Sequence, residues 1–497
     1  MTKSNPSAGR TLPLVCGCLA VSEAMYMTVE LLASRFVSPV IGTSLTAWTC
    51  VLAVILGASA VGNWVGGRLV TRCGRDWILL ALCVEAVAVA VAGVVSPTNT
   101  LAVVNSDLAL VRVVMAVVLV AVATVCAGAL SPLFMSEVRG EGERAPSALF
   151  AFMTLGGLAG TVMAGFWLIP MFGASMLSLV VGGVCVVIAG VWHLFGYGVR
   201  KWPSVRPVAC MLLALGTVVG SQALARQAMA GFGDGVRPLY SCESNYNHIE
   251  VYQGAYLGEP VDYLLVDGGF ESAAYRSRER RHDLVFSYTK KYFDTLSELG
   301  IDEGACLMMG GGAYSVPRHV LRNTDMSCDV VEIDPEVTRV AYERFDLQDA
   351  IDWAGAERFG NFNEDARTYL NREPRKYSVI LSDLYSGICP PRQVTTVEAM
   401  RHVHDMLEPG GVYMANVISD TSGERGELIK HVLATLDEVF ESVLVLPVDS
   451  RGGFDNYVVV ASDGDLGGLD SIEVPHGGYR PLTDDWCPVE YLTRDFG

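Results

Sequence analysis

The stretch "CLMMGGGAYSVPRHV", residues 306–320, joins an apolar run to a proline-led segment through consecutive glycines. The apolar letters before the glycines are typical of a buried strand, and a helix is expected to begin at Ser315. Because glycine carries no side chain, a ligand can approach the backbone N–H groups of such a turn. The stretch therefore predicts a strand–turn–helix unit, with Gly310, Gly311 and Gly312 as candidate cofactor-binding positions.

Strands and helices alternate after this loop. Residues 276–497 contain strand-like segments such as "CDVVEID" and "KYSVILSDL", separated by helix-like segments such as "PEVTRVAYERF". This alternation predicts a Rossmann-like α/β domain of the class I methyltransferase type, with a mostly parallel sheet. Before it, residues 236–275 include "HIEVYQ" and "VDYLLVDGG", which predict a small antiparallel β unit.

Acidic residues follow the predicted strands. Ligands of such sheets bind at the carboxyl ends of the strands. Glu332, which lies 22 positions after Gly310, is placed to accept both hydroxyls of a ribose. Asp365 is placed to accept from an adenine amino group, and Asp383 lies beside the same crevice. An acid-rich crevice suits a cationic sulfonium nucleoside of the S-adenosylmethionine type better than a dinucleotide, and the cysteine and histidine spacing predicts no metal.

The first 230 residues predict a multi-span transmembrane helical domain. The chain is 51% hydrophobic with a mean hydropathy of +0.35, and a spanning helix needs roughly 20 apolar residues. Seven candidate spans are expected, at about 12–34, 44–66, 77–95, 109–133, 147–169, 175–196 and 207–225. Ten Lys and Arg residues lie on the same side of the predicted spans as the N-terminus, and three lie on the opposite side. Because Lys and Arg are enriched in cytoplasmic loops, this predicts a bundle in the cell membrane with a cytoplasmic N-terminus. The side on which the C-terminal domain lies stays open.

Three carboxylates fall inside these spans. Glu23 and Glu30 lie on one helical face, and Glu85 is in the middle of the third span. Buried carboxylates in a bilayer are costly and usually face a polar interior. Two interpretations remain open, a site or path for a cation and a structural pairing with Arg35 or a hydroxyl. Close helix packing is expected at two glycine pairs with small-xxx-small spacing, Gly62 with Gly66 and Gly156 with Gly160.

The two halves of the chain differ in charge. Residues 1–233 carry a net charge of +5, and residues 234–497 carry −23. The acidic half excludes nucleic acid as a partner and would attract small cationic molecules, although solubility alone also accounts for it.

Seven motifs of the second half occur in the order of a known family: "ESNYNHIEVYQ", "LLVDGGFESA", "GGGAYSVPRHV", "VVEIDPEV", "NEDARTYL", "SVILSDLYSG" and "LTDDWCPVE". With the apolar first half, the chain resembles the membrane-fused members of the spermidine synthase (polyamine aminopropyltransferase) family. The resemblance implies a transferase that moves the aminopropyl group of decarboxylated S-adenosylmethionine to a diamine such as putrescine. It also implies a homodimer.

By motif position, the resemblance implies that Asp383 is the general base and that Tyr288 lines the amine site. It assigns Glu332 and Asp365 to the ribose and the adenine. The soluble members carry an acid where this chain has Ala313, and glutamine where it has Glu271. Glu271, Asp484 and Asp485 are therefore candidate substitutes for the groups that grip the amine.

Two alternatives stay open. Ala313 removes a charge that would repel the carboxylate of undecarboxylated S-adenosylmethionine, and Arg318 lies one helical turn away. The protein would then be a methyltransferase or another S-adenosylmethionine-dependent transferase, with Arg318 as a cofactor contact. Alternatively, the domain is a non-catalytic polyamine or nucleoside sensor coupled to the membrane bundle.

Overall fold

The computed structural model describes residues 11–41, 45–95, 106–138, 144–196, 213–214, 216–217, 238–372, 375–385, 389–449 and 453–493. The chain divides into two compact units. The first contains residues up to Arg237 together with Cys242–His248, and the second contains Pro238–Ser241 and Ile249–Gly497.

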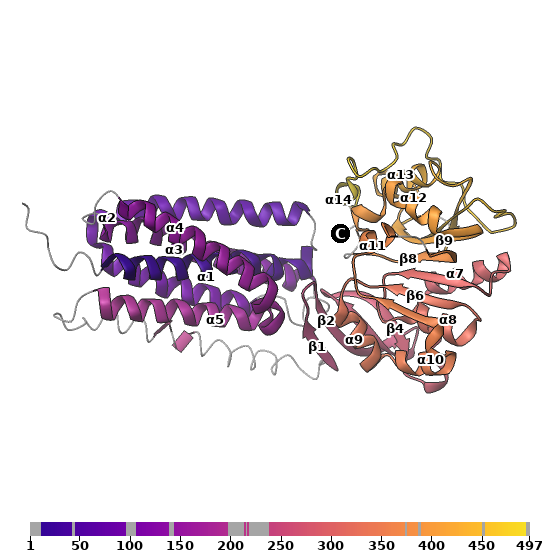
Figure 1. Ribbon diagram of the computed structural model, residues 1–497, viewed down its shortest axis with the longest axis horizontal. Helices are drawn as coiled ribbons and strands as arrows, with labels where there is room; N and C mark the ends of the chain where they lie inside the picture. Colours follow the sequence, from indigo (N-terminus) through magenta and orange to yellow (C-terminus); the bar gives the residue numbers. More distant parts are fainter. Residues whose placement is uncertain are drawn as a thin grey trace, which may run out of the picture. The chain divides into compact units, whose positions relative to one another are not determined.

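The first unit is a helical bundle (Figure 1). Its elements are α1 (Thr11–Ile41), α2 (Leu45–Val95), α3 (Ser106–Glu137), α4 (Arg144–Met163), η2 (Ala164–Leu168), α5 (Ile169–Val191) and η3 (Trp192–Gly196). Six stretches are long and apolar enough to cross a bilayer, and α2 contains two of them, Trp48–Thr71 and Asp76–Val95. The sequence predicted seven. The seventh, 207–225, lies almost entirely outside the described residues, so the described part of the chain has six.

Close packing at the two glycine pairs is confirmed. A side-chain carbon built on Gly62 would lie 2.2 Å from the backbone oxygen of Val125, and one on Gly66 would lie 2.6 Å from that of Ala129. The same holds for Gly156 and Gly160 of α4, which lie against the backbone of α1 at Ala20 and Ala24. Without a side chain at these positions, helix backbones come into direct contact, as the small-residue spacing predicts.

The second unit begins with a small antiparallel sheet in the order β1-β2-β3-β4. Its strands are β1 (Tyr240–Glu243), β2 (His248–Tyr256), β3 (Glu259–Val266) and β4 (Gly269–Tyr275). Burial along β3 does not alternate strictly, since Leu264 and Leu265 are both buried and the pairing with β4 shifts register between them. The sheet brings β4 to the glycine loop, because the hydroxyls of Ser272 and Ser315 lie 2.8 Å apart.

A seven-stranded sheet follows, in the order β10-β11-β9-β8-β5-β6-β7. The strands are β5 (Ala305–Met309), β6 (Ser327–Val331), β7 (Phe359–Phe362), β8 (Tyr377–Ser382), β9 (Leu407–Ser419), β10 (Ser442–Pro447) and β11 (Asp455–Ser462). Strands β9, β8, β5, β6 and β7 are parallel, whereas β11 and β10 are antiparallel additions. The chain moves outward from β5 through β6 to β7 and then returns to β8 on the other side of β5. The switch point therefore lies between β5 and β8.

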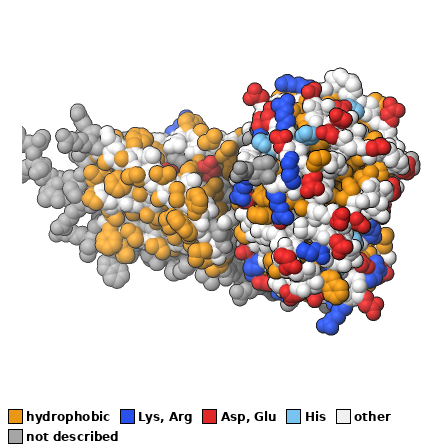
Figure 2. Space-filling model, turned by 45° about the vertical axis from the view of Figure 1, so that its right-hand side comes forward, with side chains coloured by type: hydrophobic (Ala, Val, Ile, Leu, Met, Phe, Trp, Pro, Cys, Tyr) orange, Lys and Arg blue, Asp and Glu red, His pale blue; other side chains and the backbone are white. Residues whose placement is uncertain are grey.

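Helices cover both faces of this sheet (Figure 1). They are α7 (Ser287–Leu299), α8 (Ser315–Asn323), α9 (Pro335–Arg344), α10 (Leu347–Ala354), α11 (Ala366–Leu370), α12 (Val397–Met406), α13 (Glu427–Leu436) and α14 (Val489–Leu492). Along β5, Leu307 and Met309 pack with α12 and α13, whereas Cys306 and Met308 pack with α7 and α8. Charged side chains cover the outside of this unit, and hydrophobic side chains cover the helical bundle (Figure 2).

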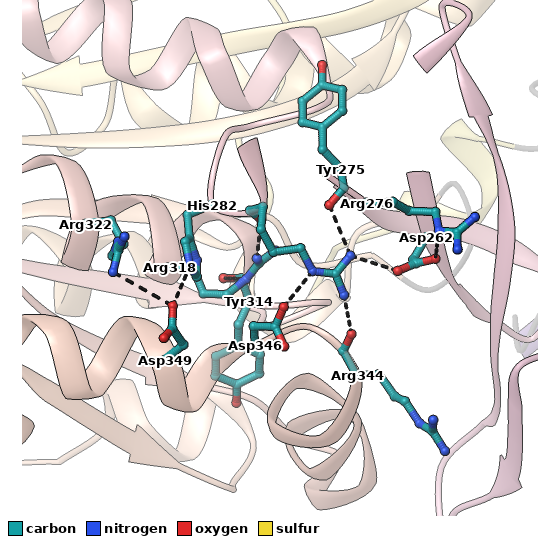
Figure 3. Close-up of polar contacts among 11 residues, drawn as sticks. Asp262, Tyr275, Arg276, His282, Tyr314, Arg318, Arg322, Arg344, Asp346 and Asp349 are labelled. Atoms are coloured by element: carbon teal, nitrogen blue, oxygen red, sulfur yellow. Dashed lines mark hydrogen bonds and ion pairs between the residues drawn. The ribbon is translucent and has the colours of Figure 1, made fainter. Parts of the chain in front are cut away.

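Arg281 connects the small sheet to the helices that follow β6. Its guanidinium donates to Asp262 of β3 at 2.8 Å and to the carbonyl of Tyr275 at 3.1 Å. It also donates to Asp346 at 2.9 Å and to the carbonyl of Arg344, and Figure 3 labels its partners Asp262, Tyr275, Asp346 and Arg344. The side chains of Arg281 and Asp262 are each only 12% exposed, so this pair is largely removed from water.

We expect Arg281→Ala to destabilise the α/β unit by about 3 kcal/mol, because it leaves the buried carboxylate of Asp262 without its main partner. Hydrogen exchange of the β3, β4 and α9 amides in the full chain measures the loss. Arg280→Ala is the matched control, since Arg280 is exposed and its ion pairs with Glu259 and Asp283 are on the surface. Equal protection in the two variants would contradict this assignment.

Candidate active site

The glycine loop after β5 passes directly against the end of β8. Gly310 and Gly312 have φ values of +94° and +52°, which side-chain-bearing residues rarely adopt. A side-chain carbon on Gly310 would lie 2.3 Å from the backbone oxygen of Asp383. The Asp383 N–H in turn donates to the carbonyl of Met309 at 3.0 Å. Glycine at 310 is therefore required for the loop and Asp383 to lie side by side.

Glu332 ends β6 and anchors the same loop. One carboxylate oxygen accepts from the N–H of Gly311 at 2.8 Å, and the other accepts from the N–H of Asp334 at 2.9 Å. Burial raises the pKa of Glu332, and the backbone N–H groups oppose this shift. Each carboxylate oxygen has a further acceptor position. Glu332 can thus hold the loop and still accept ligand hydroxyls.

Asp383 follows the last residue of β8 and is held at both oxygens. Tyr288 of α7 donates its hydroxyl to Oδ2 at 2.8 Å, and the Asn416 amide of β9 donates to Oδ1 at 2.9 Å. Burial raises the pKa of Asp383, and these two hydrogen bonds oppose the shift. Burial and the neighbouring Asp383 raise the pKa of Tyr288 well above its usual range, so Tyr288 remains a donor. The carboxylate is oriented and desolvated, as a general base requires.

Glu271, from β4 of the small sheet, completes a group of carboxylates. Burial raises its pKa to about 8, and the nearby charges of Asp383, Glu332 and Asp267 add to the shift. These acids come from the ends of β8 and β6 and from the turn between β3 and β4. Carboxylates this close cannot all ionise cheaply, so the site favours either bound protons or a cationic ligand.

Asn456 orients Asn416 and in this way supports the position of the Asp383 carboxylate. Its amide donates to the side-chain oxygen of Asn416 at 2.8 Å, which leaves the Asn416 N–H₂ directed at Asp383. Neither asparagine was predicted from the sequence. Asn456 lies on β11, an antiparallel strand paired with β9, and its partner Asn416 is 40 positions earlier. Strand-like alternation alone gives no sign of such a pairing.

Asp365, Asp484 and Asp485 are not tied to this group by any described hydrogen bond or ion pair. Asp365 accepts from the N–H of Thr368 at 3.0 Å and so caps α11. Asp484 forms an ion pair with Arg367 at 2.8 Å and accepts from Thr396. Asp485 is exposed.

Arg318, which was expected to contact the ligand, is a fully buried residue of α8. Its guanidinium donates to the carbonyl of Arg281 at 2.6 Å and to that of Tyr314 at 3.2 Å, in the region that Figure 3 shows. One terminal nitrogen of the guanidinium is buried without a described hydrogen-bond partner. The described hydrogen bonds connect α8 to the segment before α7, and a contact between Arg318 and a cofactor stays a prediction.

A small cavity of about 40 Å³ is lined by Ser382 and Leu384, the residues on either side of Asp383 in the chain. Most of its other lining residues are apolar, among them Pro390, Val394 and Met400, and its polar lining residues include Thr395 and Asn416. Within the described residues, no group of three or more His, Cys, Asp or Glu side chains is placed to hold a metal ion.

Known proteins share this domain. Residues 301–450 match the family described as the spermine/spermidine synthase domain. A probable polyamine aminopropyl transferase from Bifidobacterium longum is 30% identical over 30% of this chain and 33% of its own length. Polyamine aminopropyltransferase 1 from Streptomyces coelicolor is 28% identical over 52% of this chain and 49% of its own. The match thus spans at most about half of either relative.

Among solved structures, a probable spermidine synthase from Corynebacterium glutamicum is 25% identical, covers 49% of this chain and 96% of that one, and has a TM-score of 0.42. The α/β unit is therefore similar to the spermine/spermidine synthase domain and to proteins named as aminopropyltransferases. This agrees with the resemblance seen in the sequence.

We expect Gly311→Ala to weaken binding of an adenosyl ligand at least tenfold. The added carbon would lie 2.5 Å from the Tyr314 ring and 3.1 Å from the Glu332 carboxylate, so the loop must shift away from the acid that holds it. Calorimetry with methylthioadenosine measures the change. Gly477→Ala is the control, because a carbon added there meets nothing within 4 Å. Unchanged affinity in Gly311→Ala would show that the loop is not part of the ligand site.

Proposed function

We propose that the chain is a membrane-bound transferase that moves the aminopropyl group of decarboxylated S-adenosylmethionine to a small amine such as putrescine. One observation carries the proposal: a desolvated carboxylate, Asp383, is held by Tyr288 and Asn416 beside a glycine loop and two further carboxylates. The names of the relatives support this reaction class.

The chemistry follows from the geometry of Asp383. The amine nitrogen attacks the aminopropyl carbon bonded to the sulfonium sulfur, so a C–N bond forms as the C–S bond breaks. Methylthioadenosine leaves with the bonding electron pair, and the sulfonium charge is neutralised. The attacking nitrogen becomes positive and passes its proton to Asp383. The fixed orientation of this carboxylate by Tyr288 and Asn416 is what makes it a general base.

The remaining groups are assigned to binding. Glu332 and the loop N–H groups suit the ribose, and Asp365 is assigned to the adenine. Glu271 suits the ammonium groups of the amine, because a carboxylate surrounded by other acids gains most from a cationic ligand. Asp484 and Asp485 remain candidates for the outer part of the amine site, and a homodimer is part of the proposal.

The helical bundle is proposed to lie in the cell membrane with its N-terminus in the cytoplasm. Six apolar stretches of 20 to 26 residues support insertion. Hydrophobic side chains such as Leu56, Trp64, Phe166 and Met171 are exposed on these helices, which a lipid environment explains.

One observation favours a second candidate function, the transfer of a group from undecarboxylated S-adenosylmethionine. Ala313 is buried and apolar, so the loop presents no acid there to repel a substrate carboxylate. The second observation, the position of Arg318 near the loop, gives weaker support, because the described hydrogen bonds of its guanidinium go to backbone carbonyls. Calorimetry with the two donors separates the candidates, and tighter binding of the undecarboxylated form would favour the second.

We expect Asp383→Asn to reduce aminopropyl transfer by about 10²- to 10⁴-fold while donor binding is retained, since the amide keeps the shape but cannot accept the proton. In the wild type the rate should fall with decreasing pH, because the raised pKa of Asp383 means that acid protonates it earlier than an ordinary aspartate. Products are read by mass spectrometry after incubation with either donor and a panel of amines. Donor binding with no turnover of any amine by the wild type would instead favour the sensor.

We expect the binding of an amine to release a proton from Glu271. At neutral pH it is mostly protonated, because its pKa is raised to about 8, and a bound ammonium favours the ionised form. Putrescine binding should therefore release up to about one proton near pH 7, and less well above pH 8. Calorimetry in buffers of different ionisation enthalpy measures this. Glu271→Gln should abolish the release, whereas the same substitution at the exposed Glu298 of α7, Glu298→Gln, should not change it.

A further inference from the structure

The core of the helical bundle is divided by a polar layer. One apolar cluster includes Leu19 of α1, Cys83 of α2 and Leu130 of α3, and a second includes Val29, Ala86 and Ala123 of the same helices. Glu23 of α1, Glu85 of α2 and Cys126 of α3 fall between the two clusters in each helix. The layer thus crosses several helices at one level of the bundle.

The side chains of this layer contact one another. Ser131 of α3 donates to a carboxylate oxygen of Glu23 at 3.3 Å, and Glu85 is hydrogen-bonded to the thiol of Cys185 of α5. Glu23 and Cys126 lie close enough to Glu85 to interact electrostatically with it.

Two polar atoms in this region lack a hydrogen-bond partner. Glu85 is only 1% exposed, and its second carboxylate oxygen accepts nothing. Ser22, the residue before Glu23, is 4% exposed, and its hydroxyl is likewise unpartnered. Buried polar atoms are rarely left in this state, because each costs the bonds it made to water. The layer therefore has unused capacity to bind something small.

The charge of the layer indicates what is bound. Among the described residues, the groups that interact with Glu23 and Glu85 are hydroxyls, thiols, the Tyr26 phenol and each other, with no Lys or Arg. Glu85 is fully buried and Glu23 is partly buried, so leaving both ionised without a cation would carry a desolvation cost. A pocket in the bundle that is lined by apolar side chains, among them Ala33, Phe36 and Val120, includes neither carboxylate. A proton needs no cavity, so it is the cation that this packing accommodates most readily.

We propose that Glu85 and Glu23 form a site that binds an exchangeable proton in the centre of the bundle. Proton uptake converts one carboxylate to a carboxylic acid, whose new O–H donates to the other carboxylate, and release restores both charges. Tyr26 and Glu30 continue from Glu23 along α1 at helical spacing, and Tyr26 interacts with both glutamates. Glu30 is only half-buried, so this row provides the exchange route between the layer and the end of the bundle.

The test uses the purified full chain in detergent and the hydrophobic reagent dicyclohexylcarbodiimide, which modifies protonated carboxyl groups. Mass spectrometry should find the label on Glu85 or Glu23, and labelling should fall about tenfold per pH unit on the alkaline side. Glu85→Gln should remove the pH-dependent label, and Glu30→Gln should slow proton exchange without removing the site. Glu137→Gln, at the last residue of α3, is the matched control and should change neither.

Infrared spectroscopy provides a readout that does not depend on reagent access. The carbonyl band of protonated carboxylic acids should contain a component that disappears as the pH is raised and that Glu85→Gln lacks, while the thermal unfolding of this variant resembles that of the control. The difference spectrum between the wild type and Glu85→Gln isolates this component, because Glu271 contributes to the band equally in both proteins. A band and a label that do not change with pH would overturn the proposal, because the pair would then be a fixed structural contact. Protection from labelling by sodium at constant pH would also overturn it, in favour of a metal cation. Absence of both band and label at every pH would overturn it as well.

Discussion

The close approach between Gly310 and Asp383 is the contact on which the proposed active site depends. Parallel pairing of β5 with β8 places the ends of the two strands at the same edge of the sheet, and the missing side chain at 310 lets the loop lie against the Asp383 backbone. Gly311 then reaches Glu332 at the end of β6, which fixes the third strand end relative to the other two. A substituent at 310 would separate the loop from the proposed base, whatever the other residues did.

Carboxylates at adjacent strand ends repel one another, and the fold compensates this repulsion only in part. Backbone N–H groups stabilise Glu332, and Tyr288 and Asn416 stabilise Asp383, so both have partners for their charge. For Glu271, by contrast, the surrounding charges only raise the pKa. The remaining electrostatic repulsion is greatest at Glu271, and a ligand with a sulfonium or ammonium group would remove it. The site is therefore electrostatically complementary to cations, because other described groups of the protein do not compensate the charge of Glu271.

The sequence was sufficient where local pattern and strand direction determine position. Glycines after β5 and acids after β6 and β8 must meet at one edge of a parallel sheet, and they do so. It was insufficient where long-range pairing or side-chain direction decides. Asn456 reaches the site only because β11 pairs with β9 in a particular register, and the guanidinium of Arg318 turns toward the carbonyl of Arg281. In the bundle, hydropathy predicted seven apolar stretches, six of which lie in the described part of the chain, but it could not reveal that Glu85 and Glu23 share one layer.

The two units share one electrostatic feature, a group of carboxylates without a described basic partner, in different surroundings. Each brings carboxylates together away from water, and neither pairs them with described Lys or Arg side chains. In the α/β unit Asp383 and Glu271 keep part of their surface exposed, so a cationic organic substrate is proposed to supply the missing charge there. In the bundle Glu85 is 1% exposed and lies between two packed apolar clusters, which suits a cation as small as a proton. The exposure of the carboxylates, rather than the type of acidic residue, thus distinguishes the cations that the two sets are proposed to bind.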